Sequence, residues 1–136
     1  MSFLLDTNVL SEVRKPRPNR AVASWFRSVA GIDLYVSVLA VGEIRQGIER
    51  LRPRDSSQAT VFERWLEMLK SDFSDRILPV SAHVAEIWGR MNAGRPLPID
   101  SLVAATALAH GLTLVTRDAA ALDGTGVDLL DPWCAQ

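Results

Sequence analysis

Near its start the chain reads Phe3-Leu4-Leu5-Asp6-Thr7-Asn8, three apolar residues followed by three polar ones. The apolar run has the length of a buried strand, and the polar residues end it. Apolar residues then recur at helical spacing from Val9 to Val13, until prolines break the pattern. A short buried strand followed at once by a helix is the unit from which α/β proteins are built.

The same alternation continues to the end of the chain. Further strands are expected at residues 34–38, 77–80, 112–116 and 127–130. The second of these contains a proline, which is tolerated best in an edge strand. Strands separated by helices predict an α/β fold with a largely parallel sheet, although the order of the strands does not follow from the pattern.

Helix signals fill the intervals between these strands. Asn19, Asp55 and Ser81 are placed to cap helices that begin just after them. The segment from Asp100 to Gly111 is rich in alanine and apolar nearly all round before the glycine stops it. Such a helix is expected to be buried between the sheet and other helices.

Composition limits the class of protein. The 136 residues are 48% hydrophobic and 23% charged, which predicts one folded domain spanning residues 1–136. A single cysteine, Cys134, excludes an internal disulfide framework and favours a reducing compartment. Apolar runs fall short of the ~18–20 residues of a membrane span, and a signal peptide is not evident. We therefore expect a soluble, cytoplasmic protein.

Carboxylates follow several of the expected strands. Asp6 directly follows the first, and Asp118 follows the strand at 112–116. Glu43 lies in the first turns of the helix after the second strand, close to its buried face, and Asp100 starts the alanine-rich helix. Ligands of parallel α/β sheets bind beyond the carboxyl ends of the strands. The four acids are therefore expected to converge at one end of the sheet.

Each acid also has a purely structural interpretation. Asp6 and Asp118 could be helix caps or turn residues, and Asp100 suits a helix N-terminus through the macrodipole. Glu43 is harder to explain in this way because its helical position lies near the buried face. The combination of all four favours a shared site.

Converged carboxylates need a compensating charge. A pair 4 Å apart repels by about 4 kcal/mol at an effective dielectric of ~20. Lysine cannot supply the compensation, because the chain has only Lys15 and Lys70. One cysteine and two histidines in unrelated segments do not make a zinc site. An all-oxygen site instead predicts Mg²⁺ or Mn²⁺, and such sites commonly hydrolyse phosphodiesters through a bound water.

Four motifs occur in order along the chain: Asp6-Thr7-Asn8-Val9-Leu10-Ser11-Glu12, Ser37-Val38-Leu39-Ala40-Val41-Gly42-Glu43-Ile44, Ile99-Asp100-Ser101-Leu102-Val103-Ala104-Ala105-Thr106-Ala107 and Leu114-Val115-Thr116-Arg117-Asp118. Together they resemble PIN-domain nucleases, especially the VapC/FitB-type toxins of type II toxin–antitoxin systems. The resemblance spans essentially the whole chain. It implies a PIN-like three-layer α/β fold with a mostly parallel central sheet flanked by helices.

The resemblance also implies roles for individual residues. The catalytic acids that bind Mg²⁺ or Mn²⁺ would be Asp6, Glu43, Asp100 and Asp118. Thr7 and Thr116 would line the site and orient the ligands or the water. The implied function is a metal-dependent endoribonuclease that hydrolyses RNA without a covalent protein intermediate. The implied partners are an RNA substrate, a cognate antitoxin and a second copy of the chain, with a larger toxin–antitoxin complex on DNA and no membrane.

Basic residues offer candidate RNA contacts. Residues 1–54 carry nine Lys or Arg and five Asp or Glu, whereas residues 55–136 carry six and eleven. Within the basic half, Arg14, Lys15 and Arg17 fall between two expected helices. The ordinary interpretation is a solvated loop, but beside an acidic metal site these residues become candidates for phosphate contacts. The tryptophans at 25, 65, 88 and 133 are interpreted as core or dimer-surface residues rather than as a base-stacking platform.

Two other classes of function also place acids in an α/β or PIN fold. A phosphoacceptor receiver domain needs paired acids near the first strand and a lysine after a late strand. The chain has a lone Asp6 there and no lysine beyond Lys70, which disfavours that class. A PIN-fold binding module that acts through an antitoxin and DNA, with little or no cleavage, stays open. The four filled acidic positions favour the enzyme.

Overall fold

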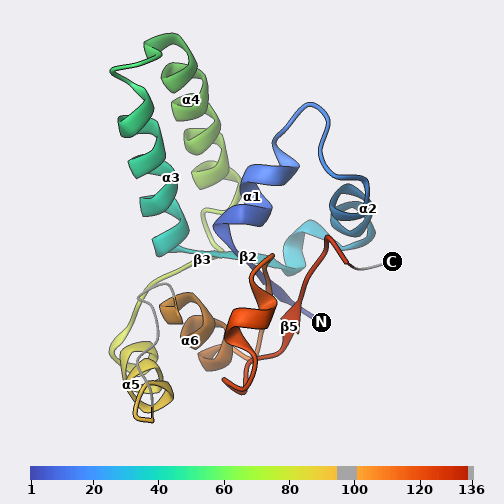
Figure 1. Cartoon of the computed structure of the whole chain (residues 1–136), viewed down its shortest axis with the longest axis vertical. Helices are drawn as coiled ribbons and strands as arrows, with labels where there is room; N and C mark the ends of the chain where they lie inside the picture. Colours follow the sequence, from blue (N-terminus) through green and yellow to red (C-terminus); the bar gives the residue numbers. More distant parts are fainter. Residues whose placement is uncertain (95–100, 135–136) are drawn as a thin grey trace.

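A parallel sheet forms the centre of the protein, in a computed structural model that describes residues 1–94 and 101–134 (Figure 1). Within those residues the sheet has five strands in the order β3-β2-β1-β4-β5. The strands are β1 Phe3–Leu5, β2 Leu34–Ser37, β3 Ile77–Leu78, β4 Thr113–Val115 and β5 Leu129–Leu130. The predicted parallel α/β sheet is thus confirmed, and the first strand in the sequence lies in its middle.

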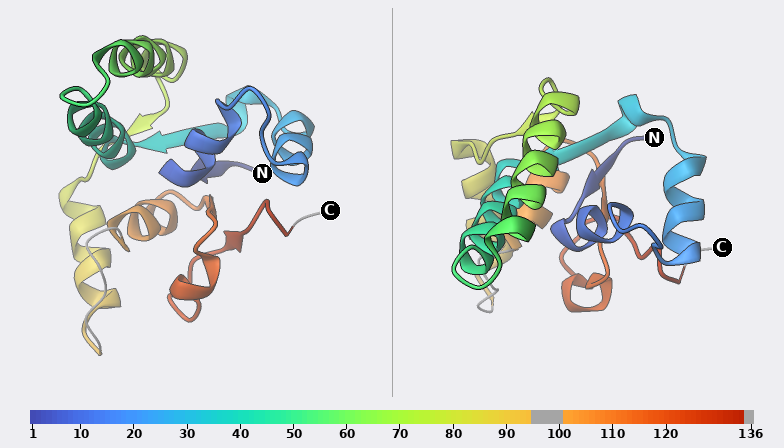
Figure 2. Two further views of the ribbon diagram at one scale, coloured as in Figure 1. Left: turned by 45° about the horizontal axis from the view of Figure 1, so that its top comes forward. Right: turned by 90° about the horizontal axis from the view of Figure 1, so that it is seen from above.

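Helices cover both faces of this sheet. They are α1 Thr7–Val13, α2 Arg20–Ser28, α3 Val38–Leu51, α4 Ser56–Asp72, α5 Ala82–Met91 and α6 Ser101–Ala109, with short 3₁₀ turns η1 Gly31–Asp33 and η2 Ala119–Leu122. Figures 1 and 2 show α1 to α4 on one face and α5 and α6 on the other. This arrangement confirms the predicted three-layer fold. In the described residues no helix is long and apolar enough to cross a bilayer.

Strand β1 shows why both faces need a helical layer. Phe3 and Leu5 face the core formed with α1, α3 and α4, whereas Leu4 faces the core formed with α6. Leu4 and Leu5 are both fully buried. Successive side chains of a strand point to opposite faces, so three consecutive apolar residues require apolar cover on both sides.

The predicted helix signals are confirmed at the positions that the sequence indicated. Asn19, Asp55 and Ser81 are the N-caps of α2, α4 and α5, and each side chain accepts hydrogen bonds from backbone amides of its helix. Gly111 follows the end of α6 with a φ of +64°, a left-handed conformation that glycine adopts without steric cost.

All four later strands are shorter than expected. β4 covers Thr113–Val115 rather than residues 112–116, and β5 covers Leu129–Leu130 rather than residues 127–130. Residue 38 was expected in a strand, but Val38 starts α3 because the hydroxyl of Ser37 accepts a hydrogen bond from the Leu39 amide at 3.0 Å. The expected strand at 77–80 is confirmed at the sheet edge but includes only Ile77–Leu78. Pro79 follows directly, and its lack of an amide hydrogen explains the early end.

A charged network joins α3 to α4. One guanidinium nitrogen of Arg45 lies 2.6 Å from Glu63 and 3.0 Å from Glu49. Arg52 lies 2.9 Å from Glu49 and 3.3 Å from Glu63. The hydrogen bonds from Arg52 and Arg45 lower the pKa of Glu49 from an ordinary 4.5 to about 2. The bond from Arg45 likewise lowers the pKa of Glu63.

This network predicts a weak, acid-sensitive contribution to stability. A carboxyl whose pKa is lower in the folded state stabilises the fold fully above its unfolded pKa and loses that effect as pH falls toward its folded pKa. We expect the contribution to fade between pH 4.5 and about 2. Because the groups are exposed, the effect is small. Melting temperatures of wild type and Glu49→Gln should therefore converge over this range, with Glu86→Gln, in an exposed pair 3.7 Å from Arg90, as control. Parallel curves down to pH 2 would contradict the prediction.

Candidate active site

The register of the sheet places Asp6 beside Thr116. Leu5 of β1 lies opposite Val115 of β4, and the Asp6 amide donates to the Val115 carbonyl at 2.9 Å. The next residues on the two strands are therefore neighbours, and the Thr116 hydroxyl donates to Asp6 Oδ2 at 2.8 Å. Thr116 is fully buried, so the protein interior holds this hydroxyl in place.

Asp6 also starts helix α1. Its Oδ1 accepts a hydrogen bond from the Thr7 amide at 2.9 Å, and Asp6 is the N-cap of the helix. The structural interpretation of this aspartate is thus correct, and it is compatible with a functional one. Both carboxylate oxygens accept hydrogen bonds, which fixes the orientation of the carboxylate at the carboxyl edge of the sheet.

Thr7 connects α1 to Glu43. The Thr7 hydroxyl donates to Glu43 Oε1 at 2.8 Å, joining residues that are 36 positions apart in the sequence. Among the described residues, no hydrogen-bond donor contacts the other oxygen, Oε2. The sequence placed Glu43 close to the buried face of its helix, and the structure corrects this prediction. Its neighbour Ile44 is buried on α3, but Glu43 itself is exposed, because adjacent helical residues point about 100° apart.

Asp118 is joined to the same edge through the loop after β4. Its amide donates to the Thr116 hydroxyl at 3.1 Å, and Asn8 Nδ2 donates to Asp118 Oδ2 at 3.4 Å. The Arg117 amide donates to Asn8 Oδ1 at 3.4 Å. Asn8 is a site residue that the sequence reasoning missed. Its only signal was its place directly after Asp6 and Thr7 in the first motif.

Hydrogen bonds from Thr7, Thr116 and Asn8 thus orient three of the four predicted acids at this edge of the sheet. In the described part of the chain, neither Glu43 nor Asp118 forms an ion pair with a basic side chain. Their donors are neutral hydroxyl and amide groups, which orient a carboxylate without cancelling its charge. Glu43 and Asp118 therefore offer oxygen ligands with uncompensated negative charge, which fit a hard divalent cation.

The fourth predicted acid, Asp100, lies outside the described residues. Within residues 1–94 and 101–134, no group of three or more Asp, Glu, His or Cys side chains is placed to hold a metal ion. The described acids alone therefore do not complete such a site. Residue 101, which follows Asp100, begins the buried helix α6, as the sequence predicted.

The three basic residues predicted to bind RNA differ in their surroundings. Lys15 Nζ lies 2.9 Å from Glu12 Oε1, and the other oxygen of Glu12 accepts from the Asn19 amide at 2.8 Å. These two bonds lower the pKa of Glu12 and tie the loop between α1 and α2 to the start of α2. Arg17 is exposed on that loop, and Arg14 lies instead against the aromatic rings of Phe62 and Trp65.

The family model described as the PIN domain matches residues 3–124. This chain belongs to the PIN-domain family. The toxin FitB of Neisseria gonorrhoeae is 35% identical over 96% of this chain and 98% of its own length. The VapC ribonuclease Y4jK of Sinorhizobium fredii is 32% identical over 96% of this chain and 97% of its own length.

A solved structure of FitAB bound to an IR36 DNA fragment contains a chain with the same fold. It superposes with a TM-score of 0.89 and 33% sequence identity over 98% of this chain and 97% of that chain. These relatives confirm the resemblance to VapC/FitB-type toxins that the four sequence motifs carried.

A pocket in this PIN fold includes one of the predicted acids, Glu43. Its volume is about 210 Å³, and it lies between α1, α3 and α4. It is lined by Thr7, Ser11, Arg14, Glu43, Ile44, Gly47, Ile48, Phe62 and Trp65. Two predicted site residues, Thr7 and Glu43, therefore share this α1–α3–α4 pocket with the aromatic rings that support Arg14.

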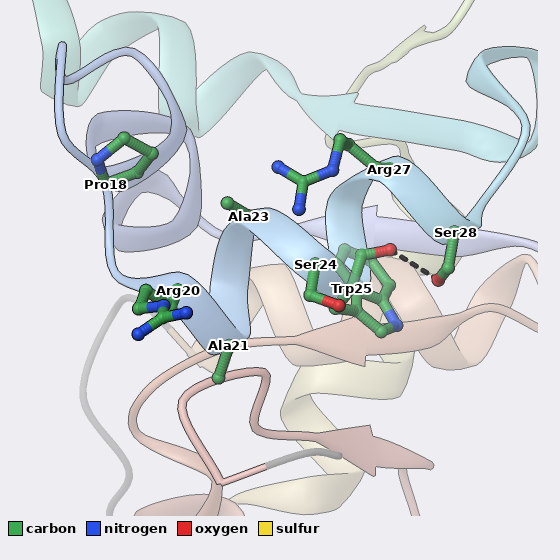
Figure 3. Close-up of a pocket in the computed structure, with 8 residues that line it drawn as sticks. All are labelled: Pro18, Arg20, Ala21, Ala23, Ser24, Trp25, Arg27 and Ser28. Atoms are coloured by element: carbon green, nitrogen blue, oxygen red, sulfur yellow. Dashed lines mark hydrogen bonds between the residues drawn. The ribbon is translucent and has the colours of Figure 1, made fainter.

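A larger pocket of about 720 Å³ lies on α2, as Figure 3 shows. It is lined by Pro18, Arg20, Ala21, Ala23, Ser24, Trp25, Arg27 and Ser28. None of these is a predicted acid. Trp25 packs edge-on against Phe3, with 5.2 Å between ring centroids, so the indole is part of the fold as the sequence indicated. Size alone does not connect this pocket to the acidic edge.

Proposed function

We propose that this PIN-domain protein is a cytoplasmic, metal-dependent endoribonuclease and the toxin of a toxin–antitoxin pair. The observation that supports it best is the row of acids at the carboxyl edge of the sheet. Hydroxyl and amide groups of Thr7, Thr116 and Asn8 donate to Glu43, Asp6 and Asp118 there. The relative Y4jK is named a ribonuclease, which agrees with RNA as the substrate.

In this proposal Asp6, Glu43, Asp100 and Asp118 hold Mg²⁺ or Mn²⁺, directly or through water. When bound, the cation supplies an acidified water for attack on the phosphodiester and offsets the negative charge of the reacting phosphate. The all-oxygen donor set is the one that these two cations prefer.

Threonine hydroxyls give the acids their geometry. Thr116 donates to Asp6 Oδ2, and Thr7 donates to Glu43 Oε1. Such outer hydrogen bonds fix the direction of a ligand carboxylate and commonly affect activity by 10–100-fold when they are removed. Asn8 plays a similar part for Asp118 through a longer contact of 3.4 Å.

We also propose that the chain binds a cognate antitoxin, forms a homodimer and joins a larger toxin–antitoxin complex on DNA. The related structure of FitAB on a DNA fragment supports this assembly. Helix α4 exposes the apolar side chains of Val61 and Met68, which are 52% and 64% exposed. Apolar side chains this exposed are candidates for contact with a partner chain.

Cation binding should be visible as a change in stability. We expect Mg²⁺ or Mn²⁺ to raise the melting temperature in a concentration-dependent way. At a free cation concentration of 100 times the dissociation constant, the free energy of unfolding should rise by roughly 2.7 kcal/mol. Asp100→Asn should stabilise the metal-free protein, because it removes one repelling charge, and should weaken the response to metal. A melting temperature that ignores both the cation and the substitution would mean that the acids do not share a site.

RNA cleavage distinguishes the enzyme from the binding module. Purified protein is incubated with single-stranded RNA in Mg²⁺ or Mn²⁺, and a parallel sample contains EDTA. The enzyme cleaves only with the cation. Tight binding to a co-expressed antitoxin and to DNA, without any metal-dependent cleavage, would favour the binding module instead.

A further inference from the structure

The α1–α3–α4 pocket joins the acidic edge to a supported arginine. The guanidinium carbon of Arg14 lies 4.2 Å from the ring centroid of Phe62 and 5.6 Å from that of Trp65. In the described part of the chain Arg14 forms no ion pair. Cation–π attraction to the two rings therefore holds the guanidinium in place, and no acid among the described residues neutralises its charge.

A second arginine–aromatic pair lies at the other end of the acidic row. Arg117, which directly precedes Asp118, has its guanidinium carbon 4.9 Å from the ring centroid of Trp133. Glu43 follows β2, Asp6 follows β1 and Asp118 follows β4 along the chain. Because these strands are neighbours in the order β2-β1-β4, Asp6 comes between the other two acids across the sheet. The row of acids thus has a ring-supported arginine on each side.

We propose that the α1–α3–α4 pocket is a nucleotide subsite, in which a base of single-stranded RNA stacks on the guanidinium of Arg14. The adjoining phosphate then reaches the acidic edge past Thr7 and Glu43, which line the same pocket. This subsite rests on the proposed ribonuclease function, because it supplies the substrate contact next to the cleaved bond.

The chemistry of Arg14 favours a base over a phosphate alone. A guanidinium is planar and stacks on the π faces of bases, whereas a contact with phosphate needs only a positive charge. Arg14 lies against Phe62 and Trp65 but remains exposed, so a base can approach its guanidinium from solvent. Bases of a duplex are already stacked and are not accessible, so such a subsite selects single strands.

The structure thereby separates two residues that the sequence grouped together. Arg17 is exposed and has no aromatic ring against it among the described residues, so it offers a positive charge for a phosphate but no ring-supported stacking face. Trp65 was interpreted from the sequence as a core or dimer-surface residue. It does pack against the core around α3 and α4, but it is only half-buried and it also supports Arg14.

Arg14→Lys tests the subsite, because it keeps the positive charge and removes the flat stacking group. Binding of a single-stranded RNA oligomer is measured in EDTA with Asp6→Asn protein, which prevents cleavage. We expect Arg14→Lys to weaken binding about tenfold, the usual scale of one stacking contact. Arg27→Lys, in the separate pocket on α2, should bind as the parent does. Phe62→Leu, checked for an unchanged melting temperature, should weaken binding in the same direction.

An oligomer of equal length and charge that lacks bases is the decisive comparison. The parent and Arg14→Lys proteins should bind it equally, because it offers only phosphates. A loss of affinity that is the same for both oligomers, or no loss for either, overturns the subsite. So would normal RNA binding by Arg14→Lys together with loss of a co-purifying antitoxin, because the pocket would then belong to the protein partner. Metal-dependent cleavage by wild type, measured separately, shows whether the ribonuclease proposal itself stands.

Discussion

Asp6→Asn is expected to reduce metal-dependent RNA cleavage by at least ~10²-fold while the protein stays folded. Asparagine has the shape of aspartate and is an equally good helix N-cap, so its side-chain oxygen can still accept from the Thr7 amide. The Thr116 hydroxyl can rotate to accept from the new amide group. The change therefore removes a negative charge from the edge of the sheet and leaves the local hydrogen bonds in place.

Matched preparations of wild type, Asp6→Asn and Asp128→Asn would test this prediction. Asp128 is exposed just before β5, so its replacement removes the same charge away from the acidic row. The substrate is single-stranded RNA with Mg²⁺ or Mn²⁺, and circular dichroism confirms folding. Cleavage by Asp6→Asn at the wild-type rate would indicate a contaminating nuclease and exclude the proposed mechanism.

The sequence predicted the acids of the site more fully than it predicted their connections. Asp6 was found because a polar residue after a buried parallel strand lies at the ligand-binding edge of any such sheet. The bond from Thr116 to Asp6 spans 110 positions and depends on β1 and β4 being neighbours. Neighbouring strands are not encoded in hydrophobic periodicity, so this contact required the structure.

Arg14 shows the same limit for helix packing. Its place just after α1 follows from the helical pattern and the prolines, and the sequence grouped it with its basic neighbours. Its contact with Phe62 depends on how α1 and α4 pack, because the two residues are 48 positions apart in the chain. The charged network between α3 and α4, including Arg45 and Glu63, likewise combines a predictable helical spacing with an unpredictable helix pairing. Asp100 stays a prediction, because it lies outside the described residues.

Thr116→Val is expected to lower both stability and cleavage. Valine nearly matches threonine in shape but cannot donate to Asp6 Oδ2 or accept from the Asp118 amide. A hydrogen bond to a charged group contributes about 1.5–3 kcal/mol, so the melting temperature should fall by several degrees. The Asp6 carboxylate also loses a donor that sets its direction, and we expect cleavage to fall 10–100-fold.

Thr106→Val separates the positioning role of Thr116 from the general cost of losing a buried hydroxyl. Thr106 is also fully buried, but its hydroxyl donates at 2.7 Å to the Leu102 carbonyl within α6. The Thr106→Val protein should be less stable, but it should keep wild-type cleavage and the response of its melting temperature to Mn²⁺. Thr116→Val should weaken that response even at temperatures where all the variants are folded. If the two variants cleave equally and their melting temperatures respond equally to Mn²⁺, Thr116 contributes only to the stability of the core. The orientation of Asp6 would then have another cause.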